Sequence, residues 1–101
     1  AARHVGHMTI SSKERAELRA QAHHLPVLVH IGHEGVTDAV RKTLDDALRT
    51  RELVKVQFSK NADVKAKDAA NDLARQVEAD VVQTIGRTAT FYRHNPELEK
   101  R

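Results

Sequence analysis

Two glycines, Gly32 and Gly35, stand three residues apart between a short apolar run and an amphipathic run of the sequence. Such a turn either bends sharply or lets the backbone come close to another molecule. The helix expected after it, with Thr37 or a neighbouring residue as N-cap, offers unpaired N–H groups and a positive dipole end to a phosphate. A GxxG loop in this position is how one class of RNA-binding module holds a nucleic-acid backbone. The alternative is a turn whose glycines serve only its own conformation.

The residues that would support catalysis or a metal site are missing or badly spaced. The sequence has no cysteine, which excludes disulfides, thiol catalysis and cysteine-based zinc sites. His30 and His33 have His-x-x-His spacing, but the first falls in an expected strand and the second in a turn, with no carboxylates arrayed around them. No Ser-His-Asp constellation stands out, and no pair of carboxylates lies in an apolar setting. We therefore predict no enzyme activity, no metal site and no cofactor.

The length and charge of the chain limit the possibilities further. Its 101 residues are enough for one domain, and 17 Lys and Arg nearly balance 14 Asp and Glu, so a nucleic-acid footprint must come from local clusters of cations. No apolar stretch approaches a membrane span and no secretory signal is evident, so a cytoplasmic protein is expected. We expect residues 1–7 to be the remnant of an expression tag, 8–96 the domain and 97–101 a flexible tail.

The first half of the chain predicts the elements that position the glycine turn. Ser11 and Glu14 have the spacing of a capping box before a helix that Pro26 ends. Residues 27–31 are short, apolar and rich in β-branched side chains, which predicts a buried strand. Apolar residues then recur at helical spacing over residues 36–50, which places a second helix directly after the glycine turn.

The second half predicts the rest of a mixed sheet. Residues 52–58 form a strand that is reached through a helix, so it is expected to run parallel to the first strand. Asp63 is the expected cap of a third helix. Residues 80–85 and 88–93 form a hairpin around Gly86-Arg87, whose first position needs a positive φ. The predicted fold class is α/β, a single compact α-β-α-β-α-β-β domain with helices packed on a four-stranded mixed sheet.

Basic residues gather at several points of this frame, and each is a candidate phosphate contact or, alternatively, a solvated surface charge. Lys13, Arg15 and Arg19 lie off the apolar stripe of the first helix, and we expect them to flank the glycine turn because that helix runs into the first strand. The other candidates are Arg41 and Lys42 after the turn, Lys55, Lys60, Lys65 and Lys67 in and after the second strand, Arg87 at the hairpin tip and Arg93, expected to be exposed, at the last strand end.

Five short strings carry a family resemblance. They are Leu-Arg-Ala-Gln-Ala-His at 18–23, Ile-Gly-His-Glu-Gly-Val-Thr at 31–37, Glu-Leu-Val-Lys-Val at 52–56, Ile-Gly-Arg at 85–87 and Phe-Tyr-Arg at 91–93. In this order and spacing they resemble the CRM domain, named for chloroplast RNA splicing and ribosome maturation, and its free-standing bacterial YhbY-type form. The resemblance covers residues 10–93, nearly the whole domain.

The resemblance implies a fold similar to the C-terminal domain of bacterial translation initiation factor three. It also implies RNA binding in ribosome biogenesis, with large-subunit ribosomal RNA or its precursor in the pre-50S particle as the partner. By position, the Gly32–Gly35 loop is implied to contact the RNA backbone. Its middle residues differ in sign, because His33 pairs with phosphate only when protonated, whereas Glu34 repels it.

Two function hypotheses follow from these observations. The first is a small RNA-binding module, in which the scarcity of aromatic residues predicts weak base reading and favours recognition of structured RNA by shape. The second is a protein-interaction module that docks on a ribosomal protein or an assembly factor, with binding that depends little on salt. A monomer is expected in either case, because no strongly apolar surplus face is apparent.

Overall fold

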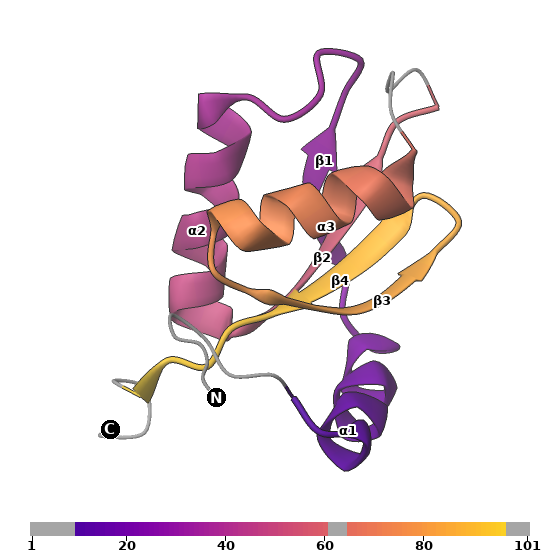
Figure 1. Ribbon diagram of the computed structural model, residues 1–101, viewed down its shortest axis with the longest axis vertical. Helices are drawn as coiled ribbons and strands as arrows, with labels where there is room; N and C mark the ends of the chain where they lie inside the picture. The colour runs from indigo at the N-terminus through magenta and orange to yellow at the C-terminus, as the bar shows by residue number, and fades with distance from the viewer. Residues whose placement is uncertain (1–9, 61–64, 97–101) are drawn as a thin grey trace.

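The computed structural model describes residues 10–60 and 65–96. Its helices and strands follow one another in the predicted order (Figure 1). In chain order they are α1 (Ser12–Ala22), β1 (Val27–Ile31), α2 (Asp38–Arg51), β2 (Leu53–Phe58), α3 (Ala66–Gln76), β3 (Asp80–Ile85) and β4 (Thr88–Tyr92). The predictions for the tag, for the tail and for the Asp63 cap lie outside the described residues.

The strands form one mixed sheet in the order β1-β2-β4-β3. β1 pairs with β2 in parallel, and β4 pairs antiparallel with both β2 and β3. In the β3–β4 turn Gly86 has a φ of +58°, a conformation that favours glycine. The structure thus confirms the predicted α/β class, the parallel crossover and the hairpin.

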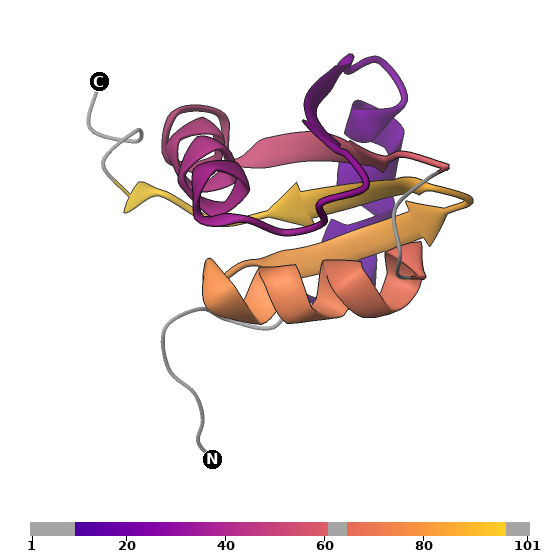
Figure 2. The same ribbon diagram turned by 90° about the horizontal axis from the view of Figure 1, so that it is seen from above.

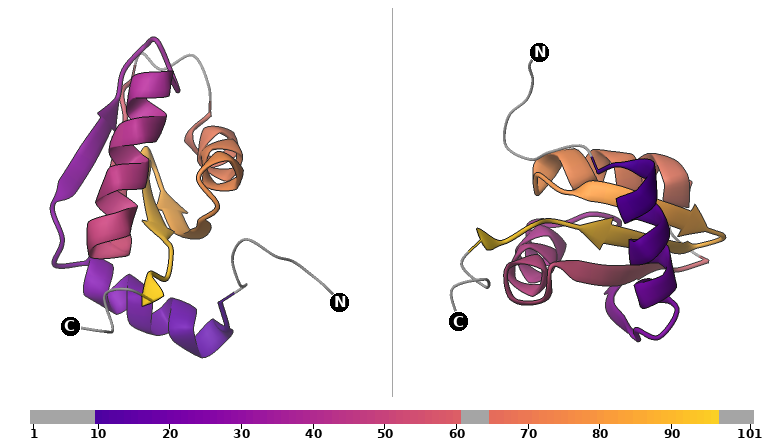
Figure 3. Two further views of the ribbon diagram at one scale, coloured as in Figure 1. Left: turned by 90° about the vertical axis from the view of Figure 1, so that its left-hand side faces the viewer. Right: turned by 90° about the horizontal axis from the view of Figure 1, so that it is seen from below.

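Helices cover the two faces of the sheet unequally. α2 and α3 pack on one face, where Leu44, Leu48 and Leu73 bury their side chains against Val56 and Phe91. Figure 2 shows α3 lying alongside β3 and β4 on that side. α1 packs on the opposite face, and it reaches only the end of the sheet where β2 begins (Figure 3). Among the residues that the structure describes, no other helix covers the rest of this second face.

α1 begins as predicted and ends earlier than predicted. The Ser11 hydroxyl accepts a hydrogen bond from the Glu14 N–H at 3.1 Å, and the Glu14 carboxylate accepts from the Ser11 N–H at 3.0 Å, which confirms the capping box. The helix ends at Ala22, four residues before Pro26. The Leu25 N–H donates to the Ala22 carbonyl at 3.0 Å, so the chain tightens into a turn before the proline is reached.

β1 is an edge strand, and the prediction that it is buried holds for one face only. Val29 and Ile31 are buried against α2, whereas Leu28 is 40% exposed and His30 is exposed on the other face. The reason is the position of α1, which does not extend over this part of the sheet. An apolar run alone does not distinguish a strand covered on both faces from one covered on a single face.

Candidate nucleic-acid interface

The Gly32–Gly35 loop lies at the edge of the sheet where β1 and β2 end, at the top of Figure 1. The Ser59 N–H donates to the Ile31 carbonyl at 2.8 Å, and the Phe58 N–H donates to the Arg87 carbonyl at 2.7 Å. These bonds hold the start of the loop, the end of β2 and the β3–β4 turn next to one another. α3 also begins at this side of the molecule. The segments that the sequence separates thus meet at one edge.

We call this region the loop edge. It comprises the Gly32–Gly35 loop and the residues at the neighbouring ends of elements: Thr37 before α2, Lys60 after β2, Lys65 and Lys67 at the start of α3, and Arg87 in the β3–β4 turn.

The loop itself is a tight turn in which the two glycines differ. The Gly35 N–H donates to the Gly32 carbonyl at 2.9 Å, with His33 and Glu34 exposed between them. Gly35 has a φ of +76°, so the turn itself favours glycine there. Gly32 has no positive φ, and a side-chain carbon built on it would meet no atom within 4 Å. The conformation of the turn therefore explains Gly35 and leaves Gly32 unexplained.

The N-terminus of α2 is partly satisfied by its own residues. Thr37 is the N-cap, as predicted, and its hydroxyl accepts from the Val40 N–H at 3.2 Å. Asp38 adds a carboxylate to the first turn, where it pairs with Arg41, and the Arg41 guanidinium also donates to the Gln76 amide oxygen at 3.1 Å. The positive end of the helix dipole thus already faces a carboxylate, which reduces what it offers to a phosphate.

The cations of the loop edge are free of ion pairs within the described residues. Lys60, Lys65, Lys67 and Arg87 are all exposed, and no carboxylate among residues 10–60 and 65–96 pairs with any of them. Side chains of this kind can move to meet a polyanion without first breaking an internal contact.

Two of the predicted RNA contacts make hydrogen bonds within the fold. Arg93, expected to be exposed, is 19% exposed at its side chain, and it donates to the Asp45 carboxylate at 2.6 Å, the Val77 carbonyl at 2.8 Å and the Asp45 carbonyl at 3.0 Å. Arg15 donates to the carbonyls of Val81 and Val82 at 2.6 and 3.0 Å, which fastens α1 to β3. Charge type in the sequence does not distinguish such arginines from surface ones.

The structure also corrects the expected position of the α1 cations. Lys13 and Arg19 are exposed but lie at the end of the sheet opposite the loop edge, because α1 leads into the beginning of β1 and the glycine loop follows its end. Lys42 lies on α2, 3.7 Å from the Asp46 carboxylate. Lys55 is half-buried on the sheet face that α1 leaves open.

Lys55 marks a part of the surface that the sequence did not reveal. It lines two adjacent hollows on either side of the chain segment that leaves α1. The larger, about 380 Å³, is lined by Gln21, Leu25, Pro26, Leu28, Thr50, Arg51, Leu53 and Lys55. The smaller, about 190 Å³, is lined by Ala22, His23, Lys55, Gln83, Ile85, Thr88 and Thr90. The alternation of side chains in β2 indicates on which face of the sheet Lys55 lies. The order of the strands, which decides its neighbours, could not be predicted from the sequence.

Neither a candidate metal-ion cluster nor a candidate membrane helix occurs among residues 10–60 and 65–96. No group of three or more His, Asp or Glu side chains there is arranged to hold a metal ion. No helix in this part of the chain is long and apolar enough to cross a membrane.

Known proteins resemble the chain over most of its length. The CRS1/YhbY (CRM) domain matches residues 10–93. The probable RNA-binding protein YqeI of Bacillus subtilis is 35% identical over 88 residues, which are 87% of this chain and 92% of that protein. An RNA-binding protein of Haemophilus influenzae is 37% identical over 92 residues, 90% of this chain and 92% of the relative.

A solved structure agrees with the sequence comparisons. The solution structure of a hypothetical protein of Staphylococcus aureus, described as a candidate RNA-binding protein, has a TM-score of 0.75 and 31% identity, and the match covers 86% of this chain and 91% of that one. The chain therefore belongs to the CRS1/YhbY (CRM) domain family.

Proposed function

We propose that this protein binds RNA and that the loop edge holds the RNA backbone. Membership of the CRM family and the names of two relatives as RNA-binding proteins support RNA binding in general. The observation that supports the loop in particular is Gly32, whose lack of a side chain serves no need of the fold. A residue that leaves the backbone bare at an exposed turn is suited to the close approach of a phosphate.

In this mechanism the loop and the cations have different roles. The turn from Gly32 to Gly35 gives the phosphate access to backbone groups, while Lys60, Lys65, Lys67 and Arg87 neutralise neighbouring phosphates. Each neutralised phosphate releases counterions, so affinity falls as salt rises. Glu34 opposes the phosphates, and we assign no attractive contact to its carboxylate.

The test is a salt series with a labelled transcript of large-subunit ribosomal RNA and three proteins: the wild type, Gly32→Asp and Ala20→Asp. Aspartate fits at position 32 without strain, because the φ there is not positive and the space is open. Ala20 is exposed on α1, which packs at the other end of the sheet, so its replacement adds the same charge away from the loop edge. Urea unfolding of all three verifies that they remain folded.

We expect Gly32→Asp to lower the RNA affinity and flatten its salt dependence, and we expect Ala20→Asp to bind as the wild type does. Equal binding by Gly32→Asp would contradict the loop mechanism. Tight binding to ribosomal particles with no salt dependence would point to the other hypothesis, a protein partner on the ribosome.

We further propose that the RNA partner is the large-subunit ribosomal RNA in its pre-50S precursor, as the family resemblance implies. Co-sedimentation of the tagged protein with precursor particles, and not with small subunits, is the expected result. Equal distribution over all ribosomal fractions would contradict this partner while leaving RNA binding intact.

A further inference from the structure

The face of the sheet that α1 covers at one end presents two rows of side chains over the rest of its area. Strand register puts Gln83, Thr90 and Lys55 side by side in the row next to α1. The next row consists of Ile85, Thr88, Gln57 and His30. We call these two rows the open sheet face. Figure 3 shows α1 lying across the strands at its border.

The first row contains polar groups that the described residues do not satisfy. Thr90 is the buried polar residue of the described core, 1% exposed, and its hydroxyl has no hydrogen-bond partner among residues 10–60 and 65–96. It lines the smaller hollow together with Gln83. Burying a hydroxyl without a partner is unfavourable, and such groups are rare in folded proteins unless another molecule completes them.

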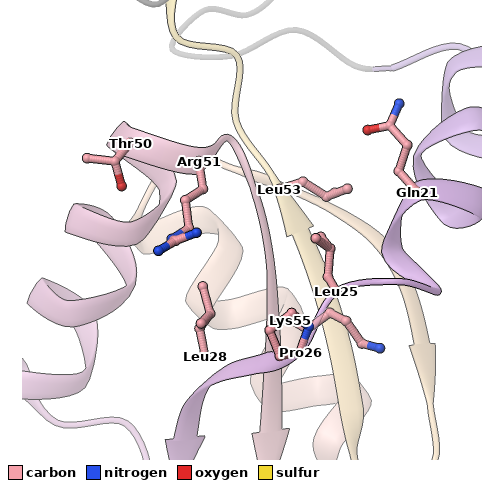
Figure 4. A pocket seen from close by; sticks show the side chains of 8 residues that line it. All are labelled: Gln21, Leu25, Pro26, Leu28, Thr50, Arg51, Leu53 and Lys55. Atoms are coloured by element: carbon pink, nitrogen blue, oxygen red, sulfur yellow. The ribbon is translucent and has the colours of Figure 1, made fainter.

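Lys55 adds an unpaired charge to the same hollow. Its side chain is half-buried, and no carboxylate of the described residues pairs with it. Figure 4 looks into the larger hollow and shows the Lys55 side chain beside Pro26, with its ammonium group on the side away from Arg51. The smaller hollow is lined by Lys55 and His23 and by no Asp or Glu, so its charge is complementary to an anion.

The hollow is continuous with the loop edge. Ile85 and Thr88 line it and also flank the β3–β4 turn, whose Arg87 belongs to the loop edge. Ile85 is 62% exposed and gives this path an apolar surface beside the polar row. The hollow and the loop edge thus adjoin at the β3–β4 turn.

We propose that the smaller hollow binds one nucleotide of an unpaired RNA segment, with Lys55 on a phosphate and the Gln83, Thr88 and Thr90 side chains on the base or ribose. This inference rests on the proposed RNA binding. An unpaired nucleotide is favoured over a duplex because a concave site with amide and hydroxyl groups suits base edges that pairing would hide. The lining has no Phe, Tyr or Trp, and the His23 imidazole is its one ring, so recognition here rests mainly on hydrogen bonds.

The test compares two labelled RNA hairpins with the same stem, one blunt and one carrying a short unpaired extension. The variants are Lys55→Gln and Thr90→Val. Their matched controls are Arg75→Gln, which removes an exposed cation of α3, and Thr84→Val, which removes a hydroxyl on the opposite face of β3. The free energy of unfolding of Thr90→Val, measured with urea, is expected to equal or exceed that of the wild type, since the hydroxyl has no partner to lose among the described residues.

We expect the wild type to prefer the extended hairpin, and each hollow variant to reduce this preference about fivefold, the effect of one lost hydrogen bond. The affinity of the two hollow variants for the blunt hairpin should equal that of the wild type. The two control variants should bind both hairpins as the wild type does. Equal affinity of the wild type for the two hairpins, or a preference that survives both variants, would overturn the inference. So would displacement by an acidic peptide without any effect of the extension, which would identify a protein ligand. If the inference fails but the wild type binds the blunt hairpin and Gly32→Asp does not, the proposed function still stands. If the wild type binds neither hairpin, both the inference and the proposed function are overturned.

Discussion

Positive side chains stand at both ends of the sheet, but they differ in what they contact. At the loop edge Lys60, Lys65 and Arg87 have no ion pair within the described residues. At the opposite end Arg93 and Arg15 donate to a carboxylate and to main-chain carbonyls. Arg15 and Arg93 thus stabilise the fold, whereas the cations of the loop edge remain available to a ligand. The number of basic residues in this chain is therefore a poor measure of its RNA-binding surface.

Arg93 should give the largest effect on stability. Arg93→Ala removes three hydrogen bonds that join β4 to α2 and α3, and it leaves the Asp45 carboxylate without its partner. We expect a loss of about 3 kcal/mol in the free energy of unfolding, measured with urea. A variant as stable as the wild type would show that these contacts contribute nothing.

Arg15 should have the next largest effect. Arg15→Ala leaves the Val81 and Val82 carbonyls without their side-chain donor and loosens α1 on the sheet. A loss of about 1–2 kcal/mol is expected. The salt dependence of RNA binding should be the same as that of the wild type under conditions where the variant is folded. A flatter dependence would place Arg15 in the RNA interface after all.

The two glycines of the loop should separate conformation from binding. Gly35→Ala forces a side chain into a φ of +76° and is expected to cost about 1 kcal/mol of stability. Gly32→Ala should change stability by less than about 0.5 kcal/mol and still weaken RNA binding, because the methyl group keeps the phosphate away. If Gly32→Ala binds RNA normally, the bare backbone at this position is not a contact.

Arg87 should have the smallest effect on the fold. Its side chain is exposed, and only its backbone carbonyl takes part in the sheet edge, accepting from Phe58. Arg87→Ala should change the free energy of unfolding by less than about 0.5 kcal/mol. A loss similar to that of Arg93→Ala would remove the contrast between the two ends.

The elements of the fold were predictable because their signals are local. The capping box at Ser11, the helix period after Thr37 and the glycine of the hairpin each act within a few residues. The α2–β2 turn was harder, because Glu52 takes a φ of +66° where no glycine announces the change of direction. Tertiary contacts hold it, since the Arg93 N–H donates to its carbonyl at 2.9 Å.

The candidate site was predictable in its residue types and not in its geometry. The glycines at 32 and 35 and the lysines were visible, but the strand order that brings Arg87 beside the end of β2 was not. The open sheet face depends in addition on a register shift between Val81 and Gln83 in the β3–β4 pair, which has no signature in the sequence. Contacts between residues distant in the sequence likewise decide which Lys and Arg side chains form ion pairs, so the sequence does not show it.

The most direct test of the contrast is the slope of RNA affinity against salt for two double variants that each remove two positive charges. Lys60→Gln/Lys65→Gln acts at the loop edge, and Arg49→Gln/Arg75→Gln removes exposed arginines that pair with Asp46 and Asp72 on α2 and α3. We expect the first to reduce the magnitude of the logarithmic slope by about 2, one for each lost phosphate contact, and the second to leave it near that of the wild type. Equal changes in the two slopes would contradict a specific interface at the loop edge and would leave only non-specific attraction by net charge.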